Sequence, residues 1–333
     1  MKTGLCLLLV CLAAVVQAAP PVTPLQLLEE RPVTAMTGGN LSGLAWCQGA
    51  LWALSDRDDR RLYRLRAKAG IWQAEAEQFS APLAPPSGLS WGQQVGNWGM
   101  GVVRGGELDF EGLSCDAAGN RYLVSEAQVA VLKLPVEGSP AWLPLPANLI
   151  GQARVSGLFW QFNGLVEGLA VNPDGTRLWL AAERQNRGLL ALQQQTSGWA
   201  CGQSCVLLSE SAYQRAPAQM GGERLPLDFA DLAFFAGKLF TLERLQLQVC
   251  RRNPADGAVE RCWSFADTAL TEARRYPLPY GVAEALAVDA EGAWIGLDNG
   301  AAMGGEDFAR GDGERRPIIW RFAAPDGGWG ASS

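Results

Sequence analysis

The chain has 333 residues, of which 48% are hydrophobic and 19% are charged, and its formal net charge at pH 7 is −6. This composition supports a large hydrophobic core and excludes a disordered chain, and the negative charge argues against a nucleic-acid partner. The chain contains no histidine. A Ser-His-Asp or Cys-His catalytic arrangement and a histidine-ligated metal site are therefore excluded, which leaves carboxylates, arginines, hydroxyls and hard cations for chemistry.

Residues 1–18 have the pattern of a signal peptide. Lys2 gives the segment a positive start, and the apolar run at 5–16 is too short to span a bilayer. The small residues at 16 and 18 fit a cleavage site. We therefore expect residues 19–333 to form the mature domain, which would be periplasmic or secreted and would have no transmembrane segment.

Five segments share one pattern of short strands and turns. Each has an apolar strand, a tight turn, a second apolar strand that ends near an acidic residue, and, in most cases, a third strand. In chain order they are residues 40–65, 109–134, 163–192, 228–250 and 281–300. A loose period of roughly 54 to 69 residues, with several strands in each repeat, indicates a propeller rather than a solenoid. The sequence therefore predicts an all-β fold, a single β-propeller in which five blades are visible.

The most regular repeat is residues 163–192. Asp174-Gly175 supplies the turn between its first two strands, where a left-handed residue is needed. Glu167 lies at the start of the first strand and Glu183 at the end of the second. These two ends are neighbours in an antiparallel hairpin, so both carboxylates should lie on one edge of the sheet.

A fourth strand, often led by tryptophan, follows in most repeats, but the last repeat ends soon after Trp329. Leu25–Glu30 can supply the missing strand, close the ring and remove an exposed sheet edge. The long stretches at 83–104 and 145–161 are expected to be loops or irregular strands. Either stretch has room for a degenerate blade, so six blades are also possible.

Six cysteines remain after signal cleavage, an even number that suits disulfides in an oxidising compartment. Cys250 and Cys262 flank a hairpin turn and should face each other. Cys201 and Cys205 bracket three residues and can close a small loop. Cys47 and Cys115 lie at similar places in consecutive repeats and pair by elimination.

The starts of the first strands and the ends of the second strands should emerge at one mouth of the central channel. The acids at these places are Asp56, Glu111, Glu126, Glu167, Glu183, Glu243, Glu284 and Asp298. Two carboxylates about 6 Å apart repel each other by about 3 kcal/mol at an effective dielectric near 20. Ca²⁺, which takes about 6–8 oxygen ligands, would offset this repulsion. In that case Glu167 and Glu183 are the candidate catalytic carboxylates.

Arginines follow three of these acids directly and are candidate substrate ligands. Arg57, Arg184 and Arg244 occupy these positions. A guanidinium can form a salt bridge with the adjacent acid or hold a phosphate through two hydrogen bonds. The purely structural interpretation is open as well, because acids at strand ends also cap backbone amides or form ion pairs.

Taken together, the repeats resemble the phytase-like family described as having esterase-like activity of phytase, over nearly the whole mature chain. The residues that carry the resemblance are Leu41–Leu44 with Leu54–Asp56, Phe110–Leu113 with Leu123–Glu126, Val166–Leu169, Ala230–Leu232 with Leu242–Arg244, and Glu284–Leu286 with Leu297–Asn299. The resemblance implies a β-propeller related to the calcium-dependent phytases, and a phosphoester or ester hydrolase. The chain departs from the pattern at Ala230, because the acid comes one residue later, at Asp231.

Two functions follow from these observations. The first is an exported hydrolase of a small-molecule phosphoester or ester, in which Ca²⁺ polarises the substrate and a carboxylate guides water. The alternative is a non-catalytic propeller of the cell envelope that binds a ligand or protein at the same mouth. A closely spaced acid cluster open to solvent favours the first function, whereas acids all consumed by arginines or backbone amides favour the second.

Overall fold

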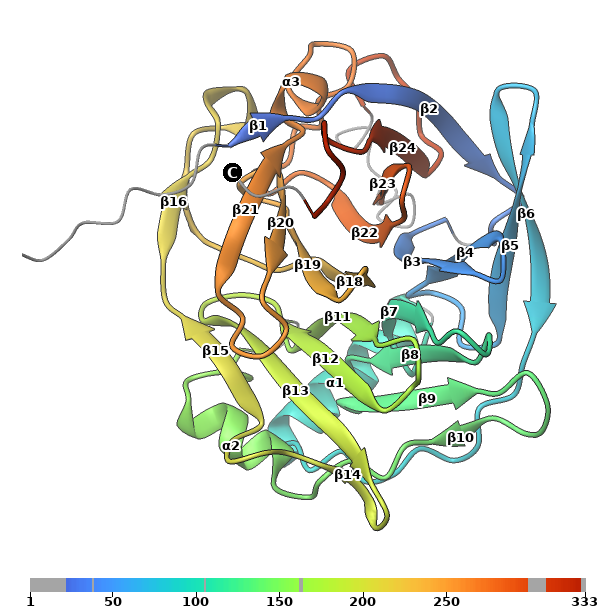
Figure 1. The fold of residues 1–333 in the computed structure, drawn as a ribbon, viewed down its shortest axis with the longest axis vertical. Coiled ribbons are helices and arrows are strands. Elements are labelled where there is room, and N and C mark those ends of the chain that lie inside the picture. The colour runs from blue at the N-terminus through green and yellow to red at the C-terminus, as the bar shows by residue number, and fades with distance from the viewer. Residues whose placement is uncertain (1–21, 38, 105, 162–163, 299–309, 331–333) are drawn as a thin grey trace, which may run out of the picture.

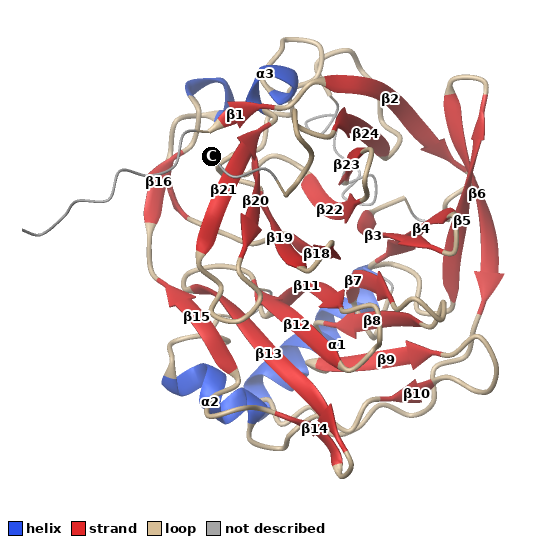
Figure 2. Cartoon of the chain, in the orientation of Figure 1, coloured by secondary structure: helices blue, strands red, loops and turns tan. Residues whose placement is uncertain are grey.

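The computed structural model describes residues 22–37, 39–104, 106–161, 164–298 and 310–330, so the expected signal peptide at 1–18 lies outside the described residues. Groups of consecutive antiparallel strands are arranged around a central axis (Figure 1). Strands account for most of the regular structure, and the described helices are few (Figure 2). The helices are α1 (Trp91–Arg104), α2 (Leu149–Val155), α3 (Ala266–Ala269) and a 3₁₀ turn (Ala218–Met220).

The first three groups of strands follow the chain from its N-terminal part. The first group is β3 (Leu41–Cys47), β4 (Ala50–Ser55), β5 (Arg61–Lys68) and β6 (Ile71–Gln78). The second is β7 (Phe110–Cys115), β8 (Arg121–Ser125), β9 (Ala130–Leu134) and β10 (Ala141–Trp142). The third is β11 (Val166–Val171), β12 (Arg177–Ala182), β13 (Arg187–Gln195) and β14 (Gly198–Ala200), with β15 (Val206–Glu210) also paired to β13.

Two further groups complete the ring. One is β18 (Asp231–Phe235), β19 (Lys238–Glu243), β20 (Gln248–Arg252) and β21 (Val259–Ser264). The other is β22 (Ala283–Val288), β23 (Gly292–Leu297) and β24 (Ile318–Ala323). A separate hairpin is formed by β16 (Tyr213–Arg215) and β17 (Arg224–Pro226). The remaining strands, near the N-terminus, are β1 (Thr23–Pro24) and β2 (Leu27–Thr34).

The first strands of the groups surround the axis. Each of β3, β7, β11, β18 and β22 contacts the next in this order, and β22 contacts β3, so the ring of inner strands closes. This arrangement confirms the predicted all-β propeller. The long stretches considered for a further blade contain α1 and α2 instead of strands.

Glycines in the inner strands let neighbouring backbones approach closely. A Cβ atom placed on Gly168 would lie 2.7 Å from the Cα atom of Asp231, and one on Gly112 would lie 2.7 Å from the nitrogen of Leu169. Real Cβ atoms do not approach backbone this closely, so only glycine fits there. The glycine after the acid in the Glu-Gly-Leu motif is therefore explained by packing at the axis.

The N-terminal segment closes the ring as expected. Strand β2 pairs antiparallel with β24, from Leu27 opposite Phe322 to Pro32 opposite Ile318. The last residues of β2 then pair in parallel with β6, and β1 pairs in parallel with β21. The predicted closing strand is thus confirmed, although it runs over Leu27–Thr34 rather than Leu25–Glu30. The same short segment joins three groups of strands.

Aromatic side chains fill the space between neighbouring groups. Trp179 of β12 stacks on Phe234 of β18, with ring centroids 5.0 Å apart. Trp46 of β3 meets Trp294 of β23 edge to face at 5.3 Å. Such pairs contribute about 0.5–1.5 kcal/mol beyond the burial of their area, so they help to hold the groups together.

All three predicted disulfides are present. Cys250 and Cys262 lie opposite each other in the register of β20 and β21. Cys47 and Cys115 connect the inner strands β3 and β7, and Cys201 is joined to Cys205. In the part of the chain that the structure describes, no helix is both long and apolar enough to span a bilayer.

Candidate metal and substrate site at the channel mouth

Bulges in the inner strands place the first set of acids at the channel mouth. The pairing register shifts between Phe110 and Gly112 in β7, and the bulged residue is Glu111. The same shift occurs at Glu167 in β11 and at Glu284 in β22, while Ser42 has this position in β3. A β-bulge redirects the side chain of its extra residue, so the bulges direct these carboxylates toward the channel mouth.

The second set of acids lies at the ends of the second strands. Asp56 follows β4, Glu126 follows β8, Glu183 follows β12 and Asp298 follows β23, whereas Glu243 is the last residue of β19. Because each hairpin returns to its starting edge, these acids come close to the bulged acids of the first set. The predicted gathering of acids from several repeats is therefore present for most members.

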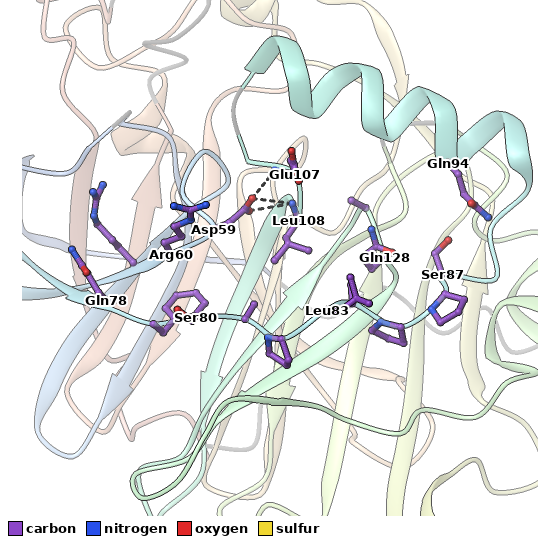
Figure 3. Close-up of a pocket in the computed structure, with 18 residues that line it drawn as sticks. Asp59, Arg60, Gln78, Ser80, Leu83, Ser87, Gln94, Glu107, Leu108 and Gln128 are labelled. Atoms are coloured by element: carbon purple, nitrogen blue, oxygen red, sulfur yellow. Dashed lines mark hydrogen bonds between the residues drawn. The ribbon is translucent and has the colours of Figure 1, made fainter.

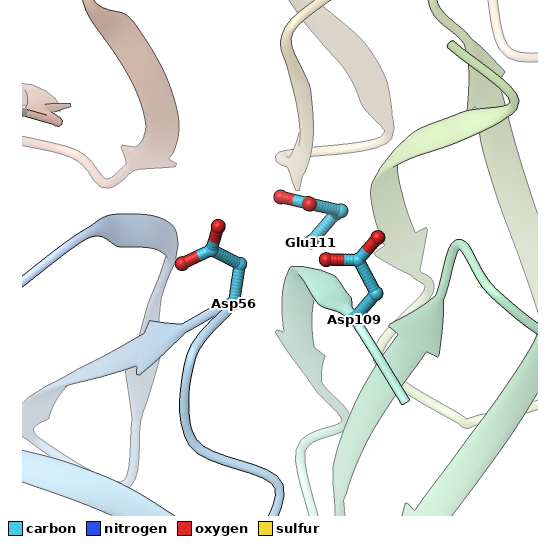
Figure 4. Close-up of side chains that lie close together, drawn as sticks. All are labelled: Asp56, Asp109 and Glu111. Carbon is cyan, nitrogen blue, oxygen red and sulfur yellow. The ribbon is translucent and has the colours of Figure 1, made fainter. Parts of the chain in front are cut away.

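Three carboxylates converge between the first two groups of strands. One oxygen each of Asp56, Asp109 and Glu111 lie within 4.8 Å of one another, and the three side chains face a common space (Figure 4). All three residues are partly exposed. Three carboxylates with access to solvent form an all-oxygen donor set of the kind that a hard cation such as Ca²⁺ prefers.

Asp109 was absent from the acids singled out in the sequence. It lies just before β7, with a positive φ of 51° that lets its side chain share the site with Glu111. The available signal was the Asp-Phe dipeptide, which occurs at Asp109 and again at Asp228. In both repeats this aspartate contributes to the mouth.

The acids in this half of the mouth favour protonation. Burial, and next the negative charge of Asp298, raise the pKa of Asp56 to about 7, although Arg57 opposes this shift. Burial and then the charges of Asp109 and Asp56 hold the pKa of Glu111 well above its usual range. The buried Oδ1 atom of Asp56 accepts no hydrogen bond from the described residues. A proton or a cation is needed to offset this uncompensated charge.

The acidic region continues toward the third group of strands. Glu126 accepts a hydrogen bond of 2.6 Å from the backbone N–H of Leu165, yet burial, followed by the charge of Asp109, raises its pKa to about 8. Burial and then the charge of Glu183 hold the pKa of Glu167 well above its usual range. Glu167 and Glu183 are thus brought together, as their places in the hairpin predicted.

The other half of the mouth is compensated by arginine. The buried guanidinium of Arg244 bonds to Glu183 at 2.7 Å, to Asp228 at 2.8 Å and also to Glu284. Burial raises the pKa of Glu284 to about 7 even though Arg244 opposes the shift. With three carboxylates as partners, Arg244 is part of the framework of the site rather than an accessible ligand for substrate.

Arg184 is the accessible arginine on this side. Its side chain is 25% exposed and pairs with Glu183. The guanidinium groups of Arg184 and Arg244 each lie 5.4 Å from the ring centroid of Tyr280, within the range of a cation–π interaction. Tyr280 was not singled out in the sequence, since a single tyrosine in a loop carries no pattern. Arg57, the third predicted substrate ligand, donates to Asp56 across 3.3 Å.

Glu243 belongs to a different network. Its carboxylate accepts from Arg187 and Arg252, each at 2.7 Å, and from the hydroxyl of Thr241 at 3.0 Å. Burial opposes ionisation, but the two arginines hold the pKa of Glu243 below its usual value. Both oxygens are occupied within the protein, so we leave Glu243 out of the cation set.

The departure from the repeat at Ala230 has a structural explanation. Asp231 occupies the place that Gly168 has in β11, and its buried carboxylate accepts from the backbone N–H groups of Leu232 and Leu286, each at 2.7 Å. The inner strand β18 has no bulge in its pairing with β19. Asp231 therefore joins β18 to β22 and does not face the cation site.

A large cavity in the described residues lies beside the acids. It has a volume of about 1140 Å³, and none of the eight predicted acids lines it. Figure 3 shows Asp59 on its inner wall, with its carboxylate accepting from the backbone N–H groups of Glu107 at 2.6 Å and Leu108 at 3.1 Å. Glu107 and Leu108 directly precede Asp109 in the chain, so this wall of the cavity adjoins the candidate cation site.

The family model described as Phytase-like, esterase-like activity of phytase, matches residues 37–252. The chain belongs to the phytase-like family. The matched residues include Asp56, Asp109, Glu111 and Arg244 of the phytase-like mouth, whereas Glu284 and Asp298 lie beyond the match. No curated protein matches the phytase-like chain.

Solved structures similar to the phytase-like chain include a glutaminyl cyclase from Myxococcus xanthus. It is 12% identical, with 90% of this chain and 97% of the cyclase covered and a TM-score of 0.48. Another is the PQQ-bound aldose sugar dehydrogenase from Streptomyces coelicolor, at 16% identity, with 91% and 100% covered and a TM-score of 0.46.

Proposed function

We propose that this phytase-like propeller is an exported, calcium-dependent hydrolase of phosphoesters or carboxylic esters. The observation that carries the proposal is the convergence of Asp56, Asp109 and Glu111 within 4.8 Å, together with the buried Asp56 oxygen that has no partner among the described residues. Repulsion between these groups costs free energy that a bound divalent cation removes.

Ca²⁺ would be held by Asp56, Asp109 and Glu111, with Glu126 and Asp298 close enough to contribute charge. When bound, the ion supplies Lewis-acid polarisation of a carbonyl or phosphoryl oxygen. Because these ligands come from two adjacent groups of strands, the ion would also stabilise the contact between them.

Glu167 is the candidate general base of this chain. Burial raises its pKa well above the usual carboxyl range, so a bound cation is needed to keep it ionised; once ionised, a carboxylate of raised pKa takes a proton from water readily. Glu183 is fully buried and bonds to Arg244 and Arg184. In this proposal Glu183 orients Arg184, whose partly exposed guanidinium donates hydrogen bonds to the anionic oxygen of the substrate.

Export is part of the proposal. The three disulfides fit an oxidising compartment, and the predicted signal peptide at 1–18 would deliver the chain to the periplasm or the exterior. Reaction of the native protein with a thiol reagent tests the first point, and N-terminal sequencing of secreted material tests the second.

The alternative is a non-catalytic propeller that binds a ligand or protein at the same mouth. The networks of Arg244 and Glu243 favour it, because several predicted acids are satisfied within the protein. In this alternative the mouth binds an anionic or cationic group without breaking a bond.

Metal analysis and hydrolysis assays separate the two functions. Purified protein would be tested with an aryl phosphate and an aryl acetate, each with added Ca²⁺ and with chelator. We expect bound calcium and hydrolysis in the parent, at least tenfold weaker calcium binding in Glu111→Gln, and no change in the control Glu291→Gln, whose exposed acid pairs with Arg321 at the surface. Calcium binding without hydrolysis of either substrate would support the binding propeller, and no calcium binding would exclude the calcium-dependent hydrolase.

A further inference from the structure

The cavity beside the acids is a groove of substantial size. Its volume of about 1140 Å³ exceeds the roughly 300–1,000 Å³ that small-molecule pockets occupy. In Figure 3 the segment from Gln78 to Ser87 lies along one side, with helix α1 above it. An extended ligand of several linked units therefore fits the groove better than a compact one.

The groove adjoins the candidate cation site through the backbone. Asp59 lies three residues after Asp56, and its carboxylate holds the N–H groups of Glu107 and Leu108, which directly precede Asp109. Gln128 on the groove wall follows Glu126 by two residues. A ligand bound in the groove would thus extend from the place where the proposed chemistry occurs.

The charges along the groove are balanced. Both oxygens of Asp59 accept from backbone N–H groups, and Arg61 pairs with Asp58 at 3.2 Å. The charged residues of the lining are Asp59, Glu107, Arg60 and Arg61, two of each sign. Balanced charge favours a neutral ligand over a polyanion.

Neutral hydrogen-bonding groups lie next to apolar surface in the lining. Gln78 and Gln128 both line the groove, and each carries a side-chain amide that can donate and accept hydrogen bonds. Phe79, Pro82 and Leu83 present apolar surface beside them, and Leu83 is 97% exposed. Saccharide rings combine apolar C–H faces with hydroxyl edges, so they match a surface of this kind.

The proline-rich wall argues against a peptide ligand. Pro82, Pro85 and Pro86 lack backbone N–H groups, so the segment cannot provide the regular series of donors that an added peptide strand requires. The same prolines limit the conformations of the wall before binding, which lowers the entropic cost of binding a ligand.

From these features we propose that the groove binds a neutral saccharide chain, and that the ester or phosphoester cleaved at the mouth is attached to this chain. The second part rests on the proposed hydrolase function, whereas saccharide binding itself does not. The amides of Gln78 and Gln128 would donate to and accept from ring hydroxyls, and the apolar wall would contact the ring faces.

Calorimetric titration with neutral hexasaccharides tests the groove. Maltohexaose, cellohexaose and chitohexaose would be added to the mature protein, with a neutral glycine–serine hexapeptide as the competing class. We expect at least one saccharide to bind, and Gln78→Ala and Gln128→Ala each to weaken it at least fivefold. Gln195→Ala, an exposed glutamine on the far end of β13, is the matched control and should leave affinity unchanged.

Hydrogen exchange locates the bound saccharide. Protection at residues 78–87, 107–108 and 127–128 would support the groove. Binding that neither glutamine variant weakens, binding of the peptide instead, or no saccharide binding at all would overturn the proposal. Saccharide binding without any ester hydrolysis would support the saccharide-binding groove and contradict the hydrolase. Calcium-dependent hydrolysis of aryl esters without saccharide binding would support the hydrolase and contradict the saccharide-binding groove.

Discussion

The guanidinium of Arg244 lies 2.7 Å from the carboxylate of Glu183, and this bond joins the end of β19 to the end of β12 at the channel mouth. Arg244 also bonds to Asp228 and Glu284, so one buried cation compensates three acids. On the opposite side Arg57 donates to Asp56 across 3.3 Å, yet burial and the charge of Asp298 still raise the pKa of Asp56 to about 7. The mouth therefore has a compensated half and an acidic half.

Replacement of Arg244 should be severely destabilising. Arg244→Met removes the partner of three buried or partly buried acids, and breaking a buried ion pair by loss of one partner costs about 3–5 kcal/mol. Chemical denaturation would measure the change. Arg321→Met is the control, because its pair with the exposed Glu291 should contribute less than about 1 kcal/mol. Equal effects of the two substitutions would contradict the assigned role of Arg244.

The stability of the calcium-free protein should fall as pH rises. The pKa values of Asp56, Glu126 and Glu284 are raised to about 7, 8 and 7, whereas unfolded carboxyls titrate near pH 4. The folded state therefore binds more protons than the unfolded state between about pH 4 and pH 8, and over this window deprotonation weakens the fold.

Melting temperatures with chelator, at pH 5.5 and pH 8, would measure this effect. We expect the lower pH to give the higher melting temperature, and added Ca²⁺ to raise the melting temperature more at pH 8 than at pH 5.5, because the ion displaces protons from its ligands. A calcium-free protein that is more stable at pH 8 than at pH 5.5 would contradict the assignment of raised pKa values.

Removal of the N-terminal strand should expose two sheet edges. Deletion of residues 19–34 leaves β24 and β6 without their partner β2. The unpaired edges and the hydrophobic side chains beneath them favour aggregation, so a lower melting temperature or light scattering is expected. A shorter deletion that removes only residues 19–24 costs the two pairs of β1 with β21 and should have a smaller effect. If the long deletion melts like the parent, β2 does not close the ring.

Gly168 is one of the two most closely packed glycines described in the inner strands. In Gly168→Ala, the new Cβ atom meets the backbone of Asp231 at 2.7 Å, and overpacking of this kind costs about 1–3 kcal/mol. Gly92→Ala in α1 is the control, since a Cβ there has nothing within 4 Å and alanine favours helix. Urea denaturation would compare the two variants, and a neutral Gly168→Ala would show that the inner strands can move apart.

The sequence by itself determined the propeller, the closing strand and the three disulfides. Strand periodicity, turn residues and the recurring acid of motifs such as Glu167-Gly168-Leu169 depend on residues that are close together in the chain, so the sequence alone reveals them. The hairpin rule also placed Glu167 beside Glu183. Cys250 and Cys262 could be paired because a two-stranded hairpin fixes their register.

Only the tertiary structure decided which acids face one another and which are already satisfied. Asp109 lies beside Asp56 because the inner strands β3 and β7 are adjacent in the ring. Glu243 instead pairs with Arg187 and Arg252, because its side chain packs toward β13 and β20. Both outcomes depend on contacts between residues far apart in the chain and on side-chain direction, for which a repeat pattern carries no signal. The same is true of Arg244. It directly follows an acid, as Arg57 and Arg184 do, so its sequence position does not distinguish it as the shared partner of three carboxylates.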